Sequence, residues 1–270
     1  MKMKKLMTMV AVLSLMMTGC GESDENTVNF KSVTVDKTVK LASGDPNTPT
    51  CSVHLQLAEA TEESGHRGEL INEEVAKVLL SIEDTDGVVL NEAAKEFAER
   101  YTKSYVANML PLYNQDRADT TRRAWYEYHY VITTETQPGS KGTVAYLATV
   151  DYYEGGAHGI HQLLTMNFEK KTGRRLMLAD IFATGYEQPL KEILIKALKT
   201  KEGVETLAAL KEKGYLFAMD MFASENFILG PTTITFVYNP YEIAPYAMGS
   251  TQLVIPYSDI DKLLKTTFDY

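Results

Sequence analysis

The middle of the chain contains two strand-like runs joined by a short turn, and these limit the folds that the chain can adopt. Residues 125–134 and 143–153 are rich in tyrosine, valine and threonine, which favour β-strands. The segment 137–142 between them reads Gln-Pro-Gly-Ser-Lys-Gly, a composition typical of turns. Two such runs predict an antiparallel hairpin, and a third run at residues 162–168 extends it.

Segments with other periodicities flank this sheet. Apolar residues at spacings of three and four predict helices over residues 69–82, from Asn91 to an end near Pro111 and Asn114, over 187–198, around 207–210 and over 259–264. Further strands are predicted over residues 33–39, 52–57, 226–229, 232–238 and 252–255. Because strands and helices do not alternate regularly, we expect an α+β fold with largely antiparallel sheets and flanking helices.

A polar stretch from Asn114 to Arg122 divides this pattern. We place a boundary there, because compositional breaks of this kind separate packed units. The prediction is two subdomains: an N-terminal α+β subdomain at residues 31–115 and a C-terminal α+β domain at residues 120–270.

The first residues have the composition of a targeting segment. Three lysines precede an uncharged, apolar run from Leu6 to Met17. This run of about 12 residues is shorter than the roughly 20 that a helix needs to cross a bilayer. A basic start, a short apolar run and small residues at its end are typical of a secretory signal peptide, here residues 1–19.

The end of this segment, Met17-Thr-Gly-Cys20, resembles a bacterial lipobox, with Met17 where leucine is usual. We expect cleavage before Cys20 and a lipid on its thiol; the alternative is an ordinary signal peptide with an incidental cysteine. Residues 20–30 then form the lipidated cysteine and a flexible, polar tether. Acidic residues in the tether resemble a surface-export signal of Bacteroidetes lipoproteins. The expected location is the cell envelope, lipid-anchored at the outer membrane, either periplasmic or surface-exposed.

Charge and cysteine content exclude some functions. The formal charge is −9, and removal of residues 1–19, with three lysines and no acid, makes it −12. No nucleic-acid partner is expected, because phosphate binding needs a basic face. Two cysteines cannot make a disulfide scaffold. With Cys20 acylated, Cys51 is the only free thiol, and its alternating apolar neighbours predict a buried strand position.

The first motif that could carry chemistry spans residues 151–161, Asp-Tyr-Tyr-Glu-Gly-Gly-Ala-His-Gly-Ile-His. Its glycines disfavour a helix, and in an extended chain His158 and His161 point to opposite faces. A zinc site would also need further ligands, so we predict no metal. Two readings stay open: a glycine-shaped turn whose histidines bond to backbone, or a ligand-contacting loop with Tyr153, Glu154, His158 and His161 as binding residues.

The second motif spans residues 239–249, Asn-Pro-Tyr-Glu-Ile-Ala-Pro-Tyr-Ala-Met-Gly. Its prolines fix the backbone outside regular structure. Tyr241 and Tyr246 combine apolar rings with polar tips, which suits contact surfaces. Either the loop packs its tyrosines on the sheet, or Tyr241, Glu242 and Tyr246 contact a ligand.

Signatures of catalysis are lacking. The sequence contains no Gly-x-Ser-x-Gly elbow and no phosphate-cradling glycine loop. We therefore predict no catalytic residues and no cofactor.

The C-terminal motifs, in their order, resemble the extracellular domain of RsiV-type anti-sigma factors. Similar modules accompany PdaC-type peptidoglycan deacetylases and occur alone in Bacteroidetes lipoproteins. The segments that carry the resemblance are residues 153–158, 167–173, 178–182, 240–249 and 255–258. The chain shows no sigma-binding arm, no spanning helix and no deacetylase domain, so neither anti-sigma signalling nor deacetylation is implied.

The resemblance implies a binding module, because RsiV-type domains bind lysozyme directly. We therefore expect a non-enzymatic, lipid-anchored envelope protein whose partner is lysozyme, another basic protein or cell-wall glycan. The alternative is a metal-assisted hydrolase of cell-wall glycan, with His158, His161 and either Glu154 or Asp151 activating water. A third reading is a structural scaffold for a neighbouring envelope protein.

Overall fold

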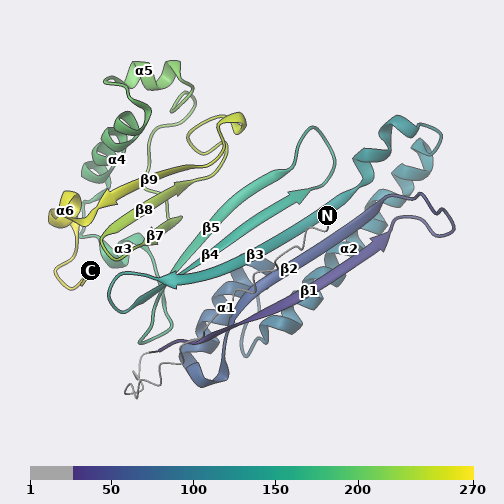
Figure 1. Ribbon diagram of the computed structural model, residues 1–270, viewed down its shortest axis with the longest axis horizontal. Coiled ribbons are helices and arrows are strands. Elements are labelled where there is room, and N and C mark those ends of the chain that lie inside the picture. The colour runs from purple at the N-terminus through teal and green to yellow at the C-terminus, as the bar shows by residue number, and fades with distance from the viewer. Residues whose placement is uncertain (1–26) are drawn as a thin grey trace, which may run out of the picture.

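The computed structural model describes residues 27–270. The predicted signal peptide at residues 1–19, Cys20 and the tether up to residue 26 lie outside the described residues. Within the described part, two sheets dominated by antiparallel pairs carry helices beside them (Figure 1), which confirms the predicted α+β class.

The larger sheet contains six strands in chain order. These are β1 (Phe30–Lys40), β2 (Thr50–Ala60), β3 (Tyr128–Pro138), β4 (Thr143–Tyr153), β5 (Ile160–Glu169) and β6 (Arg175–Leu176). All neighbours are antiparallel except β2 and β3, which are parallel. A parallel pair needs a long crossover, and the two N-terminal helices form it.

These helices are α1 (His66–Leu80) and α2 (Leu90–Asp116), and they pack on one face of the sheet (Figure 1). Ile71, Val75 and Leu79 lie four apart on α1 and are all buried. They meet buried β2 side chains such as Leu55 and Leu57 in one core. Short 3₁₀ segments follow β2 and α2, at η1 (Glu62–Ser64) and η2 (Thr120–Tyr126).

The boundary predicted between residues 115 and 120 lies between α2 and β3, and the strands on its two sides belong to one sheet. Residues 51–56 of β2 pair with residues 128–133 of β3. The same core contains Leu55 and Val75 from before the boundary and Ile132 from after it. The sheet and its core therefore continue across the predicted boundary.

The smaller sheet has the order β7-β8-β9 and its own core. Its strands are β7 (Phe227–Leu229), β8 (Thr233–Tyr238) and β9 (Thr251–Pro256). The accompanying helices are α3 (Leu178–Ile181), α4 (Glu187–Glu202), α5 (Leu207–Glu212), α6 (Tyr257–Ile260), η3 (Tyr246–Met248) and η4 (Asp261–Leu263). Leu190, Leu194 and Leu198 of α4 are fully buried against this sheet.

Two asparagine side chains attach the smaller sheet to the free edge of β5. The Asn239 side chain accepts a hydrogen bond from Leu163 N at 2.9 Å and donates to Leu163 O at 3.1 Å. The Asn226 side chain donates to Leu163 O at 2.7 Å and accepts from Thr165 N at 2.7 Å. These amides satisfy backbone groups that a neighbouring strand would otherwise satisfy.

A third asparagine, Asn167, lies on β5 itself, and its side chain bonds to the backbone of the smaller sheet. Its side chain donates to Phe227 O at 2.7 Å and accepts from Leu229 N at 2.9 Å, so it binds the backbone of β7. Asn167 is only 1% exposed. Both of its bonds therefore form where water cannot replace them.

We expect Asn167→Ala to lower the free energy of unfolding by about 2–3 kcal/mol, because it leaves the buried Leu229 N–H without its acceptor. Urea denaturation followed by circular dichroism measures the change. Asn114→Ala is the control, since Asn114 is exposed on α2 and the substitution should change stability by less than about 0.5 kcal/mol. Equal stability of the two variants would contradict this role for Asn167.

Candidate functional site

Three loops meet at the end of the larger sheet that lies farthest from Phe30. β4 runs in the same direction as β1, so the β4–β5 loop, residues 154–159, lies at the Lys40 end. The β8–β9 loop, residues 239–250, contacts it through Tyr246, whose hydroxyl donates to Gly159 O at 2.7 Å. The segment after α5 completes the group, because Leu216 N donates to Ile243 O at 2.8 Å.

His158 connects the two predicted motifs. Its ring stacks on Tyr246 with centroids 3.9 Å apart and planes 18° from parallel. Its Nδ1 faces Gly159 O at 3.0 Å, and a carbonyl only accepts, so Nδ1 carries the proton. In the neutral ring Nε2 then accepts from the Tyr241 hydroxyl, 3.3 Å away. The hydrogen bonds and the stacking hold all three rings in one arrangement.

Gly155 lets the β4–β5 loop fold tightly against the end of η2. Its φ is +82°, and a Cβ there would lie 2.7 Å from Trp125 O. A side chain would therefore clash with backbone, and the left-handed conformation would add strain. The glycines predicted to shape a turn do so, and the same turn presents His158 to the neighbouring loop.

Large apolar side chains surround this contact and point into solvent. Phe217 is 82% exposed, Met219 53% and Tyr241 59%. A cavity of about 260 Å³ lies between residues 217–219 and 241–245. We define the aromatic end surface as His158, Phe217, Met219, Tyr241 and Tyr246. Exposed apolar patches on a folded domain mark contact sites more often than isolated exposed residues do.

Backbone conformation at this surface is strained. Tyr241 has φ +74° and Leu216 has φ +54°, a region that costs a residue other than glycine about 1–3 kcal/mol. Hydrogen bonds hold both, from Tyr241 N to Ala244 O at 2.9 Å and from Leu216 N to Ile243 O at 2.8 Å. The fold thus maintains a costly conformation that leaves the Tyr241 ring exposed.

Glu242 lies at the inner edge of the cavity and is partly buried. Burial raises the pKa of its carboxyl above the ordinary value of 4.5, and a hydrogen bond from Asn239 N, at 2.8 Å, lowers it less. The carboxylate accepts from its own loop, so it stabilises the turn that carries Tyr241.

The remaining predicted binding residues have other neighbours. The Tyr153 hydroxyl donates to Gly156 O at 3.0 Å, and its ring stacks on His129. Glu154 accepts from the Tyr101 hydroxyl at 2.8 Å. His161 Nδ1 lies 2.5 Å from Asp151, which also contacts His129 at 3.1 Å. The structure therefore groups His158, Tyr241 and Tyr246, with Glu242 beside them, and leaves Tyr153, Glu154 and His161 outside the aromatic end surface.

Metal-ligating side chains do not converge in the described part of the chain. Over residues 27–270, no group of three or more His, Cys, Asp or Glu side chains is placed to hold a metal ion. His158 and His161 bond to different partners, Tyr241 and Asp151 respectively. Cys51 is fully buried in β2, as predicted, and burial raises the pKa of its thiol to about 12.

Phe217 and Met219 were not predicted from the sequence. They belong to residues 214–222, Gly-Tyr-Leu-Phe-Ala-Met-Asp-Met-Phe, a run of apolar residues without helical or strand periodicity. Such a run directly after a glycine-ended helix is the signal that could have marked an exposed loop with apolar side chains.

Comparison with solved structures identifies the family. A crystal structure of a DUF3298 family member from Bacteroides fragilis NCTC 9343 is 30% identical in sequence to this chain. It aligns with a TM-score of 0.81 over 88% of this chain and 94% of that chain. This chain belongs to the DUF3298 family.

The DUF3298 family model, described as a protein of unknown function, matches residues 179–258, which include α4, the smaller sheet and the β8–β9 loop. A DUF3298 structure from Pseudomonas aeruginosa PAO1 is 15% identical, with a TM-score of 0.56 over 90% of this chain and 97% of that one; this likeness concerns the fold alone. No curated protein matches this DUF3298 chain. Over residues 27–270, it has no helix with the length and apolarity needed to span a membrane.

We expect Glu242→Gln to raise the melting temperature at about pH 7.5 and to leave it unchanged near pH 4. Above the ordinary carboxyl pKa the native state must bury a charge that the unfolded chain keeps in water, and this cost disappears below it. Differential scanning fluorimetry across this range measures the effect, with exposed Glu212→Gln as control. A lower melting temperature of Glu242→Gln at pH 7.5 would refute the burial argument.

Proposed function

We propose that this DUF3298 protein is a non-catalytic, lipid-anchored binding module of the cell envelope that contacts a protein ligand through the aromatic end surface. The observation that carries the proposal is the contiguous exposure of Phe217, Met219 and Tyr241 beside the stacked His158–Tyr246 pair. Aromatic and methionine side chains held in place before binding supply much of the affinity of protein interfaces, because little entropy is lost on contact.

The position of the surface relative to the tether supports this role. The described chain enters the larger sheet at Phe30, and β1 runs 11 residues to Lys40. At about 3.3 Å per residue this separates the two ends of the sheet by roughly 35 Å. A protein anchored through Cys20 would therefore carry the aromatic end surface on the side away from its tether, where a ligand can approach.

Lysozyme is the first candidate ligand. The C-terminal motifs resemble RsiV-type domains, which bind lysozyme, and the β8–β9 loop with Tyr241 and Tyr246 lies in one of the matching segments. The formal charge of −12 after removal of residues 1–19 would also raise the encounter rate with a strongly basic protein.

We expect residues 20–270, with Cys20 replaced by serine, to bind at least one member of a panel of basic lysozymes in isothermal titration calorimetry. Affinity should fall as salt rises, because the long-range attraction is screened. The double variant Phe217→Ala/Tyr241→Ala should bind about a hundredfold more weakly, since it removes two central apolar contacts. Val89→Ala is the matched control: Val89 is 56% exposed but directly precedes α2, away from this surface.

The result that would refute the lysozyme proposal is an absence of binding across the panel. Unchanged affinity of the double variant would place any binding elsewhere on the protein. Binding of soluble peptidoglycan fragments but of no lysozyme would instead identify a glycan ligand, which the aromatic rings could also stack upon.

Membrane attachment is tested separately. In the native host we expect the protein to fractionate with membranes and its N-terminal peptide to carry acyl chains on Cys20, detectable by mass spectrometry. Cys20→Ala should release the protein from membranes. The apolar run at residues 6–17 is too short to span a bilayer, and the lipid on Cys20 is the only anchor that we propose. Cys51→Ala, at the other cysteine, should remain attached; release of both variants, or of neither, would contradict lipidation at Cys20.

A further inference from the structure

The smaller sheet ends in an open edge at β9. Of the described strands, β8 alone pairs with β9, so one side of β9 has no strand neighbour. Tyr257 N donates to Thr232 O at 3.1 Å, so Tyr257 is a residue whose backbone bonds to the β8 side. Along an antiparallel strand every second residue bonds to the same neighbour. Thr251, Leu253 and Ile255 consequently bond toward β8, and the backbone groups of Gln252 and Val254 point outward. This edge offers two outward N–H groups before Pro256, which has none.

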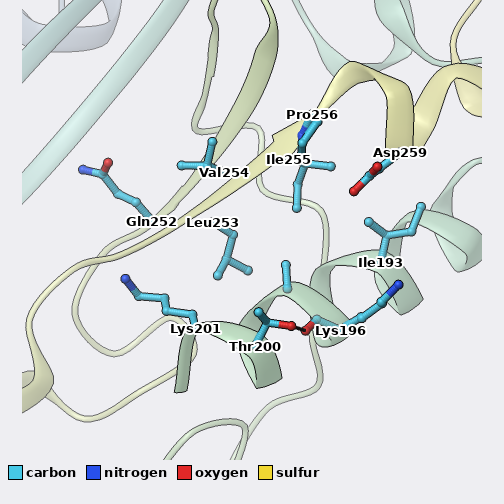
Figure 2. Close-up of a pocket in the computed structure, with 11 residues that line it drawn as sticks. Ile193, Lys196, Thr200, Lys201, Gln252, Leu253, Val254, Ile255, Pro256 and Asp259 are labelled. Carbon is cyan, nitrogen blue, oxygen red and sulfur yellow. Dashed lines mark hydrogen bonds between the residues drawn. The ribbon is translucent and has the colours of Figure 1, made fainter. Parts of the chain in front are cut away.

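A groove runs along this edge between β9 and α4 (Figure 2). It has a volume of about 630 Å³. Its apolar lining comes from both elements, Ile193 and Ala197 on α4 and Leu253 and Ile255 on β9. In Figure 2, Leu253 extends from β9 toward α4. Leu253 and Ile255 are each 2% exposed, so they form the floor of the groove, and Ile193 and Ala197 on α4 are its more accessible apolar residues. A strand edge beside a helix is a recurring arrangement for binding extended peptides.

The charges around the groove differ from those of the rest of the protein. On α4, Lys191 pairs with Asp220 at 3.5 Å, and Lys199 donates to Glu205 O at 3.2 Å. Lys196 and Lys201 line the groove and have no ion-pair partner within residues 27–270. Asp259 is the one acidic residue of the lining, so the groove carries two lysines against one carboxylate. In a chain of net charge −9, this local excess of positive charge favours an anionic occupant.

We propose that this groove binds an extended acidic segment of a partner protein, which adds to β9 as a fourth strand of the smaller sheet. Outward backbone groups of Gln252 and Val254 supply the strand hydrogen bonds. Alternate apolar side chains of the segment contact the half-buried Ile193 and Ala197 on α4, and its carboxylates meet Lys196 and Lys201. The site is separate from the aromatic end surface and does not depend on the function proposed for it.

A second copy of this chain fits the edge less well. Pairing of β9 with β9 about a two-fold axis would bring two Lys196 and two Lys201 side chains together, against one Asp259 from each copy. The excess of positive charge would repel, whereas an acidic segment neutralises it. The sign of the charge therefore selects the partner.

The probe is a fluorescein-labelled six-residue peptide of alternating glutamate and valine, titrated with the protein, residues 20–270 with Cys20 replaced by serine, and followed by fluorescence anisotropy. We expect saturable binding at low salt, and at least about tenfold weaker binding of the lysine–valine counterpart. Lys196→Glu/Lys201→Glu should weaken binding of the acidic peptide by about a hundredfold, because it reverses the charge of the groove. Lys211→Glu, an exposed change on α5, should leave the affinity unchanged.

Val254→Pro tests the backbone contribution. It removes one outward N–H from the edge while the bonds of Leu253 and Ile255 to β8 remain, so binding should weaken about tenfold. Melting temperatures of all variants verify folding, and the lysine variants decide the question if Val254→Pro unfolds.

Three outcomes would overturn the proposal. One is no anisotropy change with the acidic peptide at millimolar concentration, and another is equal binding of both peptides. The third is a dimer in sedimentation velocity that Lys196→Glu/Lys201→Glu leaves intact and Val254→Pro dissociates, which would assign the edge to a second copy.

Discussion

The attachment of the smaller sheet to β5 through asparagine side chains is the interaction on which the rest of the structure depends. The side chains of Asn226 and Asn239 form hydrogen bonds with the backbone of Leu163 and Thr165 on the edge of β5. The side chain of Asn167 on β5 forms hydrogen bonds with the backbone of β7. An amide carries both a donor and an acceptor, so it can replace one residue of a strand. The two sheets are thereby joined without a continuous ladder between them.

This attachment also sets the geometry of the aromatic end surface. Asn239 is the first residue of the β8–β9 loop, and its bonds to Leu163 fix that loop three residues from the start of β5. The β4–β5 loop ends at that same start, so His158 and Tyr246 meet although 88 positions separate them in sequence. The strained backbone of Tyr241 is held in place because Asn239, before it, bonds to Leu163 and Tyr246, after it, bonds to Gly159 O.

Much of the fold could be predicted from local patterns. Residues 143–153 form β4 with the predicted bounds, because β-branched and aromatic residues lie between clear turn signals. The end of α2 could not be predicted in this way, because Pro111 lies inside a helix that continues to Asp116. Proline removes one backbone hydrogen bond there, and the burial of Tyr113, two residues further along the helix, offsets that loss. Tertiary packing decided where the helix ends.

Contacts between distant segments explain what the sequence could not reveal. The parallel pairing of β2 with β3 joins residues about 77 positions apart, a contact that no local pattern in the sequence indicates. At the candidate site, the two motifs were recognised by composition, but their contact through His158 depends on Asn239. Phe217 and Met219 lie in a segment that is held by contacts with distant residues, among them the bonds from Leu216 N to Ile243 O and from the Tyr238 hydroxyl to Phe222 O.

The two proposed binding surfaces differ in what they can recognise, and β9 separates them. The aromatic end surface includes the loop that precedes Thr251, and the groove follows the outer edge of β9 as far as Pro256. The aromatic end surface presents aromatic rings and a strained turn, which recognise the shape and the apolar area of a ligand. The groove along β9 presents backbone hydrogen-bonding groups and two unpaired lysines, which recognise an extended, negatively charged chain. Because the strand between them bonds to β8 on its inner side, occupation of the edge leaves the loop conformation supported by Asn239 in place. If both proposals hold, a protein ligand at the end surface and an acidic segment at the edge would not compete, because they contact different parts of the β8–β9 hairpin.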